Sequence, residues 1–308
     1  MSAPLVGLTG PTASGKSGLA VTLALEFGGE VINCDSMQVY RHFDIGTAKL
    51  SNEDRRGIRH HLIDVAEGAE SFTAGDYQRV GRRVLGEIRV RGSLPIVAGG
   101  TGFYLRALID GLSHAPGRDE HLRENLLARE KRRPGALGRI LRRLDADAAA
   151  RIHFRDVPKL VRAIEIALRG QHRPSAQPPG DALQGCRVLK LGLFPPRAEL
   201  YAVLDERCKR MFSEGLLEEI EGILTIGVPR DAKPFGALGY KHGLAVLEGR
   251  MSRDEALETM QRDTRRYAKR QVTWFRHEPR MIPLNGFGAD PAVLTEARAL
   301  ITRLLDLG

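Results

Sequence analysis

Gly10-Pro11-Thr12-Ala13-Ser14-Gly15-Lys16-Ser17 is the stretch that decides the fold, and it has the G-x-x-x-x-G-K-S pattern of a phosphate-binding loop. In such a loop, a glycine-rich turn directs backbone N–H groups inward, and the following helix adds the positive end of its dipole. Lys16 would bring a positive charge to the terminal phosphates, and the Ser17 hydroxyl would bind Mg²⁺. We therefore predict that residues 10–17 bind a di- or triphosphate group, as ATP-binding loops do.

The segments around this loop alternate between strand and helix patterns. Residues 5–9 form an apolar run that predicts a buried strand, and residues 18–27 are rich in helix formers and end at Gly28-Gly29. This alternation predicts an α/β fold, namely a P-loop NTPase-like parallel sheet flanked by helices. The further elements expected in the first third are strands at 30–35, 60–65 and 94–100 and helices at 72–90 and from about 102.

From Pro116 the pattern changes to helices without a convincing strand, and a strand is predicted again at 187–194. The rest of the chain is expected to be mostly helical. A capping box at Ser252–Glu255 opens a long helix that is predicted to run to His277. We therefore predict a catalytic core made of residues 1–115 plus 181–308, with an inserted all-helical domain at 116–180.

The positive charge of the chain is concentrated in two segments. Of a formal net charge of +9, residues 116–180 carry +7, from fifteen basic and eight acidic residues. Residues 262–280 hold seven basic and two acidic residues. In a phosphate-binding protein this favours a polyanionic partner, nucleic acid first. The alternative is a solvated, arginine-rich surface.

Other features of the sequence indicate a cytoplasmic protein. No apolar run approaches the length of a membrane span, so we expect no membrane partner. The first predicted strand begins by Leu5, which leaves no room for a signal peptide. The three cysteines, Cys34, Cys186 and Cys208, have neither a disulfide framework nor a zinc spacing.

Polar residues stand where predicted strands end. Asp35, Asp64 and Thr101 each follow an apolar strand pattern. In an open parallel sheet, ligands bind beyond the carboxyl ends of the strands. We therefore expect these three side chains to lie near the phosphate loop.

Eight short stretches, in order from the first strand to Arg276, together resemble the tRNA dimethylallyltransferase (tRNA isopentenyltransferase) family. The stretches are 10–17 (GPTASGKS), 35–40 (DSMQVY), 46–49 (GTAK), 61–64 (HLID), 98–104 (AGGTGFY), 215–219 (GLLEE), 239–241 (GYK) and 269–276 (KRQVTWFR). The resemblance implies transfer of a dimethylallyl group from dimethylallyl diphosphate to N6 of adenosine 37 of tRNA, 3′ of the anticodon. The tRNAs would be those that read codons beginning with U. It also implies Mg²⁺ as cofactor.

Catalytic roles follow from the matched positions. Asp35 matches the family's D-S-x-Q motif and is our choice for the general base, because adenine N6 loses a proton as the C–N bond forms. A carboxylate in the Mg²⁺ shell near Ser17 is the alternative role. By the resemblance, Arg207 lies near the diphosphate and Thr101 contacts the target nucleotide. A helix N-cap is the alternative role for Thr101.

The resemblance also implies a tRNA-binding surface in which the insertion grips the anticodon stem-loop. Residues 236–241 and 265–276 are further candidates for RNA contact. Tyr240 and Trp274 could stack on bases, although we favour core packing for Trp274. We expect the chain to act as a monomer. The tRNA-binding residues implied are Asp35, Ser36, Met37, Gln38, Thr101, Arg123, Lys159, Arg162, Gly239, Tyr240 and Lys241.

Three positions depart from the family pattern: Phe154, Pro158 and His242. Pro158 lacks a backbone N–H and the amide of the usual glutamine, so one RNA contact is in doubt. Three other functions compete with prenyl transfer to tRNA: a P-loop small-molecule kinase, an isopentenyltransferase acting on free adenine nucleotides, and an RNA-binding module switched by a nucleotide. The first two have no need of a basic helical insertion, and the third does not explain the acid and threonine at strand ends.

Overall fold

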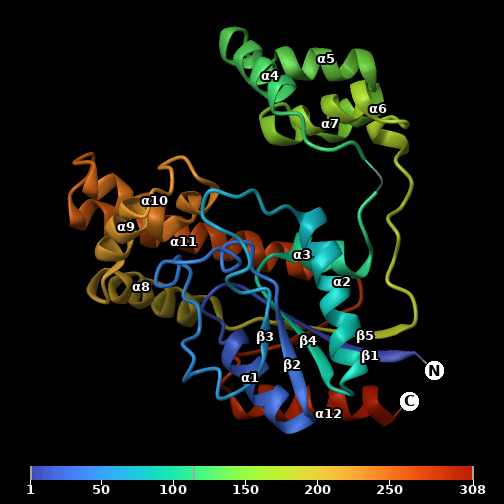
Figure 1. The fold of residues 1–308 in the computed structure, drawn as a ribbon, viewed down its shortest axis with the longest axis vertical. Coiled ribbons are helices and arrows are strands. Elements are labelled where there is room, and N and C mark those ends of the chain that lie inside the picture. Colours follow the sequence, from blue (N-terminus) through green and yellow to red (C-terminus); the bar gives the residue numbers. More distant parts are fainter. Residues whose placement is uncertain (1, 114, 307–308) are drawn as a thin grey trace. The chain divides into compact units, whose positions relative to one another are not determined.

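The computed structural model describes residues 2–113 and 115–306, and it contains a six-stranded parallel sheet (Figure 1). The strands are β1 (Ala3–Thr9), β2 (Gly29–Asn33), β3 (His60–His61), β4 (Leu94–Gly99), β5 (Cys186–Leu193) and β6 (Met281–Leu284). Their order across the sheet is β3-β2-β4-β1-β5-β6, and every neighbouring pair is parallel. The predicted fold class is confirmed.

The sheet differs from the expectation at its two edges. The third strand ends after His61 and not at residue 65, because Leu62 and Asp64 have φ values of 62° and 55°, outside the extended region. At the other edge, β6 pairs with β5 in a part of the chain that was expected to be mostly helical. Pro283 within β6 hides the pattern, yet an edge strand tolerates proline.

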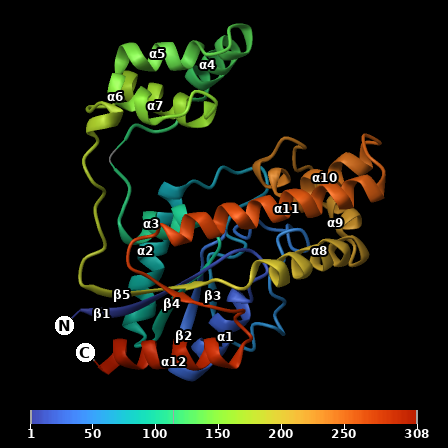
Figure 2. The same ribbon diagram turned by 180° about the vertical axis from the view of Figure 1, so that it is seen from behind.

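Helices cover both faces of the sheet, and the alternation along the strands determines which residues meet them (Figure 2). Val6 and Leu8 pack on the face covered by α1 and α12, whereas Leu5 points to the face covered by α2 and α3. Successive side chains of a strand point to opposite faces, so the apolar β1 serves both cores. The four helices are α1 (Lys16–Phe27), α2 (Ala74–Val90), α3 (Gly102–Ile109) and α12 (Pro291–Asp306).

Four more helices lie between β5 and β6 in the sequence: α8 (Arg197–Ser213), α9 (Leu216–Thr225), α10 (Leu238–Leu247) and α11 (Arg253–Arg276). The capping box that opens α11 is confirmed, because the Ser252 hydroxyl accepts the Glu255 N–H and the Glu255 carboxylate accepts the Ser252 N–H. The long α11 contacts α8, α10 and α3. Among the described residues, no helix combines the length and the apolar character that a bilayer crossing needs.

Contacts divide the chain into two units, Met1–Ile109 with Leu183–Gly308, and Asp110–Ala182. The second unit, here called the helical unit, has nearly the same residue bounds as the insertion that we predicted at 116–180. Its core is built from leucines and small apolar residues, among them Leu137, Leu141 and Leu160. Its α-helices are α4 (Glu120–Arg132), α5 (Ala136–Leu144), α6 (Ala146–Arg151) and α7 (Val157–Arg169).

A buried carboxylate holds two of these helices together. Glu165 on α7 is fully buried and accepts hydrogen bonds from Arg123 Nε (2.9 Å) and Nη2 (2.8 Å) on α4, and from the Asp119 N–H (2.7 Å). Arg162 also pairs with it. Burial alone would raise the pKa of Glu165, but these partners outweigh that effect and lower the pKa to about 2.

Replacing this carboxylate should weaken the helical unit. In Glu165→Gln, the positive charges of Arg123 and Arg162 lose their counter-charge, and we expect the free energy of unfolding at pH 7 to fall by about 3 kcal/mol. Because the folded pKa lies below the unfolded one, the contribution of Glu165 is complete above about pH 4.5 and is lost as the pH falls toward 2. Denaturation with hydrogen exchange of α4 and α7 measures it.

The matched control is Glu124→Gln, which changes an exposed carboxylate on α4, the helix that Glu165 of α7 binds through Arg123. It should leave the unfolding free energy within about 0.5 kcal/mol of the wild type. Equal stability losses in the two variants would contradict the structural role assigned to Glu165.

Candidate active site

The loop at 10–17 connects β1 to α1 and depends on glycine at two positions. Gly10 has φ 148°, and a Cβ there would lie 2.9 Å from the Leu193 carbonyl oxygen. Gly15, with φ 82°, immediately precedes α1. The segment after β6 supports the loop, because the Gly288 N–H donates to Ser14 O at 2.8 Å. The loop therefore has a fixed backbone shape with the start of a helix behind it.

Lys16 lies inside this loop. Its Nζ donates to the Pro11 carbonyl at 2.7 Å. Burial lowers the pKa of Lys16 to about 8; the negative charge of Asp35 opposes this shift and the positive charge of Arg207 adds to it. The Lys16 ammonium is therefore only weakly favoured without an anion beside it.

A cavity of about 320 Å³, here called the phosphate cavity, opens onto the loop. Lys16 and Ser17 line it from the loop, Asp35 and Gln38 from the segment after β2, and Arg207 from α8. Arg210 of α8 lines it as well, so three cations and a helix N-terminus face one space, which suits a diphosphate group. Arg207 thus lines the same cavity as five residues of the loop, namely Thr12, Ala13, Gly15, Lys16 and Ser17.

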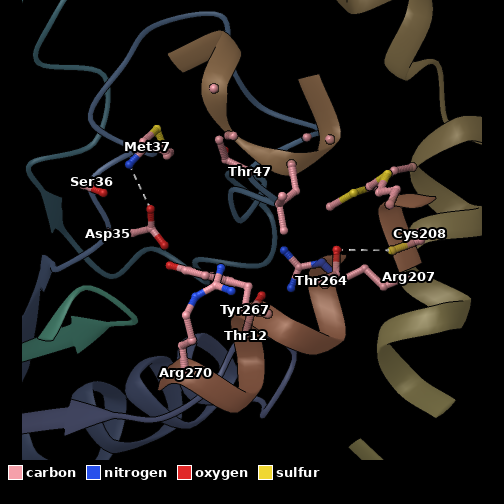
Figure 3. Close-up of a pocket in the computed structure, with 17 residues that line it drawn as sticks. Thr12, Asp35, Ser36, Met37, Thr47, Arg207, Cys208, Thr264, Tyr267 and Arg270 are labelled. Carbon is pink, nitrogen blue, oxygen red and sulfur yellow. Dashed lines mark hydrogen bonds between the residues drawn. The ribbon is translucent and has the colours of Figure 1, made fainter. Parts of the chain in front are cut away.

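A second cavity, of about 340 Å³, has an apolar part formed by α8, α11 and the residues before α10 (Figure 3). Met211, Met260 and Leu238 contribute to it, whereas Ser36 and Met37 line it from the segment after β2. In Figure 3, Asp35 and Arg207 lie on opposite sides of this cavity. The residues that line both cavities are Thr12, Asp35, Thr47, Arg207 and Tyr267.

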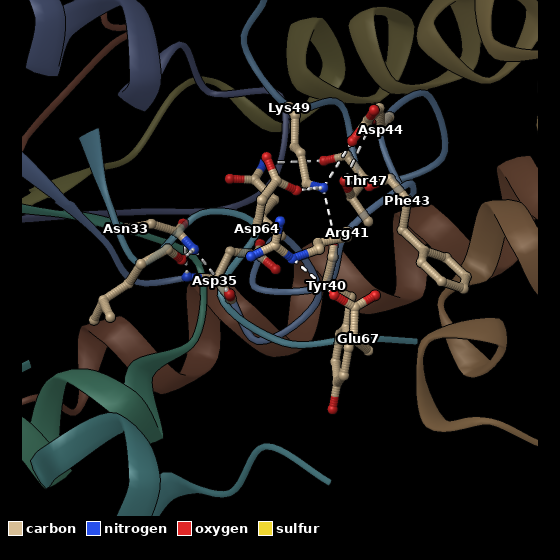
Figure 4. A network of polar contacts seen from close by, with 12 residues as sticks. Asn33, Asp35, Tyr40, Arg41, Phe43, Asp44, Thr47, Lys49, Asp64 and Glu67 are labelled. Carbon is tan, nitrogen blue, oxygen red and sulfur yellow. Dashed lines mark hydrogen bonds and ion pairs between the residues drawn. The ribbon is translucent and has the colours of Figure 1, made fainter. Parts of the chain in front are cut away.

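Asp35 is held at this junction by the turn that follows β2 (Figure 4). Its Oδ1 accepts the Met37 N–H at 2.9 Å, and its own N–H donates to Asn33 Oδ1 at 3.1 Å. Asn33 is in turn fixed by a hydrogen bond from its amide to Leu62 O at 2.9 Å. The carboxylate is therefore presented by an ordered turn, as a general base requires.

Thr101 links the segment after β4 to the segment after β2. It is not among the described residues that line the two cavities. Its N–H donates to Cys34 O at 3.0 Å, and its hydroxyl accepts the Ser36 N–H at 3.0 Å. Gly99 permits this approach, because a Cβ there would lie 2.1 Å from the Cys34 oxygen. From the sequence we considered nucleotide contact and helix capping as roles for Thr101. Neither role includes its hydrogen bonds with Cys34 and Ser36.

Two expectations about aromatic residues are wrong. Tyr240 is fully buried; its hydroxyl donates to Glu219 at 2.6 Å and accepts the Gly46 N–H at 3.1 Å, so its ring cannot stack on a base. Trp274, for which core packing was favoured, is 38% exposed and has the Arg106 guanidinium 4.5 Å from its ring centre. A single sequence does not tell which of two aromatic residues is buried.

Other predicted residues divide between the site and elsewhere. Asp64 lies outside the phosphate cavity and pairs with Lys49 at 2.6 Å (Figure 4). Gly239 lines the second cavity, and the adjacent Lys241 is exposed. His242 is buried, with its Nε2 3.4 Å from the Asp263 carboxylate.

In the helical unit, Arg123 and Arg162 both contact Glu165, whereas Lys159 is exposed and pairs with Asp156. Pro158 lies in the first turn of α7, where a missing N–H costs nothing. Phe154 is 59% exposed. Lys159 is therefore the most accessible of the three cations that the resemblance implied in the helical unit.

Sequence reasoning missed the face that α11 presents to the cavities. Met260, Thr264 and Tyr267 line the second cavity, and Gln271 lines the phosphate cavity. Their spacing of four, three and four residues is the period of one helix face. The pattern was visible, but only the fold shows that this face looks at the site and not at a core.

Comparison with known proteins agrees with this geometry. Residues 38–278 match the family model described as IPP transferase. A tRNA dimethylallyltransferase of Solibacter usitatus is 53% identical over 305 residues, which cover 98% of this chain and 99% of the relative. The chain belongs to the IPP transferase family. A tRNA dimethylallyltransferase of Koribacter versatilis is 48% identical, with coverage of 98% and 99%.

Solved structures share the fold of this chain. The tRNA isopentenylpyrophosphate transferase of Bacillus halodurans has a TM-score of 0.74 at 36% identity, with 99% of this chain and 97% of that chain covered. A eukaryotic dimethylallyltransferase acting on tRNA has a TM-score of 0.82 at 26% identity, with 99% and 80% covered. The likeness thus extends over nearly the whole chain.

The lowered pKa of Lys16 predicts a pH dependence of anion binding. Only the ammonium form attracts an anion, so raising the pH from 7.5 to 9 should weaken inorganic diphosphate binding roughly tenfold. Calorimetric titration at constant Mg²⁺ measures the Kd at each pH. Lys16→Gln should bind weakly at both values, with no such loss. An equal loss in Lys16→Gln would show that another group is responsible.

Proposed function

We propose that this chain transfers the dimethylallyl group of dimethylallyl diphosphate to N6 of adenosine 37 of tRNA, yielding N6-dimethylallyladenosine and diphosphate. Family membership and the names of the relatives support this function. The observation that carries it is the position of Asp35 and Arg207, which line both the cationic phosphate cavity and the second cavity. A base and a cation at the junction suit a reaction between two substrates.

In the proposed reaction, N6 of adenine attacks C1 of the dimethylallyl group. A C–N bond forms, and the bond between C1 and the bridging oxygen breaks. The electron pair of that bond leaves with diphosphate, and the N6 proton passes to the Asp35 carboxylate. Proton acceptance by a positioned carboxylate contributes about 10²- to 10⁴-fold to the rate of such steps.

Stabilisation of the leaving diphosphate is the other half of the reaction. Lys16, Arg207 and the start of α1 face the phosphate cavity, where negative charge grows as the C–O bond breaks. The exposed Ser17 hydroxyl and the Asp35 carboxylate line the same cavity, and such hard oxygen donors fit Mg²⁺. When bound, Mg²⁺ supplies further positive charge to the diphosphate.

The acceptor is proposed to be an unpaired base of the anticodon loop, because such a base leaves its stack at a cost of only a few kcal/mol. Ser36, Met37 and Gly239 would contact it in the second cavity. Lys159 and Lys241 are exposed and would contact phosphates. The predicted insertion at 116–180, which makes up most of the helical unit, carries +7 of the net charge of +9 and would attract the RNA backbone. We propose that the monomer is active.

The base assignment is tested with Asp35→Asn. The asparagine oxygen can still accept the Met37 N–H, so the turn persists, but the side chain cannot take the N6 proton. We expect kcat to fall about 10²- to 10⁴-fold, while the Kd for anticodon stem-loop RNA stays within a few-fold. Asp44→Asn removes an exposed carboxylate of the neighbouring loop and is the matched control. Lost RNA affinity with unchanged kcat would reverse the assignment.

One assay separates this function from its competitors. The protein is incubated with labelled dimethylallyl diphosphate and either an anticodon stem-loop with adenosine 3′ of the anticodon, the same RNA with guanosine there, or AMP. We expect label in the adenosine RNA alone. Label in AMP but not in RNA would indicate an enzyme of free nucleotides. Transfer of the ATP γ-phosphate without prenyl transfer would indicate a kinase.

A further inference from the structure

Gln271, on the face of α11 toward the cavities, joins two of the loops that form the site. Its Oε1 accepts the Thr12 N–H at 2.8 Å, and its Nε2 donates to the Gly100 carbonyl at 2.8 Å. The side chain is buried, with 6% of the residue exposed. Thr12 belongs to the phosphate loop after β1, and Gly100 follows β4. One amide therefore bridges two segments that are far apart in the sequence.

We propose that Gln271 is a positioning residue for prenyl transfer, which fixes the phosphate loop relative to the strand end that carries the base. This inference rests on the proposed function. It assigns Gln271 a role different from the RNA contact expected for residues 265–276, because both polar atoms of its amide are already engaged inside the protein.

The hydrogen bonds continue from Gln271 to Asp35. Gly100 is followed by Thr101, whose N–H donates to Cys34 O and whose hydroxyl accepts the Ser36 N–H. Asp35 stands between Cys34 and Ser36. The path from the Thr12 N–H through Gln271 and Thr101 therefore reaches both peptide units that flank the base. A displacement of about 1 Å between diphosphate and base is enough to cost 10²-fold in rate.

The chemistry of the position requires an amide. One end of the side chain must accept a hydrogen bond and the other must donate one, and a carboxylate offers acceptors only. Gly100 leaves room for the contact, since a Cβ there would lie 2.4 Å from Gln271 Nε2. Leucine would leave the Thr12 N–H and the Gly100 carbonyl without partners in a buried place.

The helix that carries Gln271 is anchored at both sides of it. Toward the N-terminus, Arg265 pairs with Asp205 of α8. Beyond the C-terminus, the buried Glu278 pairs with Lys190 of β5 at 2.7 Å and with Arg106 of α3 at 2.6 Å. The position of the amide is therefore set by contacts that do not involve the cavities. Gln271 transmits that fixed position to the two loops.

Steady-state kinetics of Gln271→Leu provide the first test. We expect kcat to fall about 10- to 100-fold, with the Kd for anticodon stem-loop RNA within threefold of the wild type. The matched control is Gln261→Leu, which removes another glutamine of α11 whose amide donates to Asp205 O at 3.1 Å. Gln261 lines neither cavity, and its variant should keep kcat within threefold. Equal kcat values for the Gln271 variant and the wild type would overturn the proposal.

Gln271→Glu provides a readout that a merely structural role would not move. A protonated glutamic acid donates through its hydroxyl and accepts through its carbonyl, as the amide does, whereas the carboxylate repels the Gly100 oxygen. The ratio of kcat for Gln271→Glu to kcat for the wild type should rise at least fivefold as the pH falls from 8 to 6. A ratio independent of pH would overturn the proposal, even if the leucine variant failed to fold. Wild-type protein without prenyl transfer would instead refute the proposed function.

Discussion

The close approach of the backbone after β2 to the end of β4 is the constraint on which the site depends. Gly99 has no room for a Cβ beside the Cys34 carbonyl, and the Thr101 N–H donates to that same oxygen. Parallel strands ordinarily end some 5 Å apart, and their loops are then free to diverge. Here the two loops are fastened together, which keeps Asp35 over the junction of the two cavities. The fixed geometry of the site therefore depends on the absence of a side chain at Gly99.

Much of this arrangement could be predicted from local sequence. The pattern at 10–17 encodes its own backbone shape, and Asp35 follows an apolar run whose direction in a parallel sheet is fixed. Gln271 could not be found in this way, because its partner Thr12 lies 259 residues away. The strand β6 was missed because four residues that include a proline carry no readable period. A local sequence pattern does not show which distant surface a helix face will contact.

The helical unit shows the limit of counting charges. Its basic residues suggested a nucleic-acid partner, yet Arg123 and Arg162 converge on the buried Glu165 inside the unit. Arg123 thereby holds α4 against α7, whereas Arg162 lies on α7 itself, and the single Glu165 carboxylate offsets one of the two positive charges. The acid lies only three residues after Arg162 on the same helix. A charge count gives the sign of a surface but does not tell which of its members are already neutralised.

The support beneath the phosphate loop has a consequence for how the molecule is made. Residues 10–17 leave the ribosome early, but their fixed shape depends on Gln271 and on Gly288, whose N–H holds Ser14 O. Chains are synthesised from the N-terminus at about 5–20 residues per second. A growing chain therefore carries the loop for many seconds before the residues that hold it exist. During that time the nascent protein has the anion-binding motif without the finished anion site, and it acquires that site only after Gln271 and Gly288 have been synthesised.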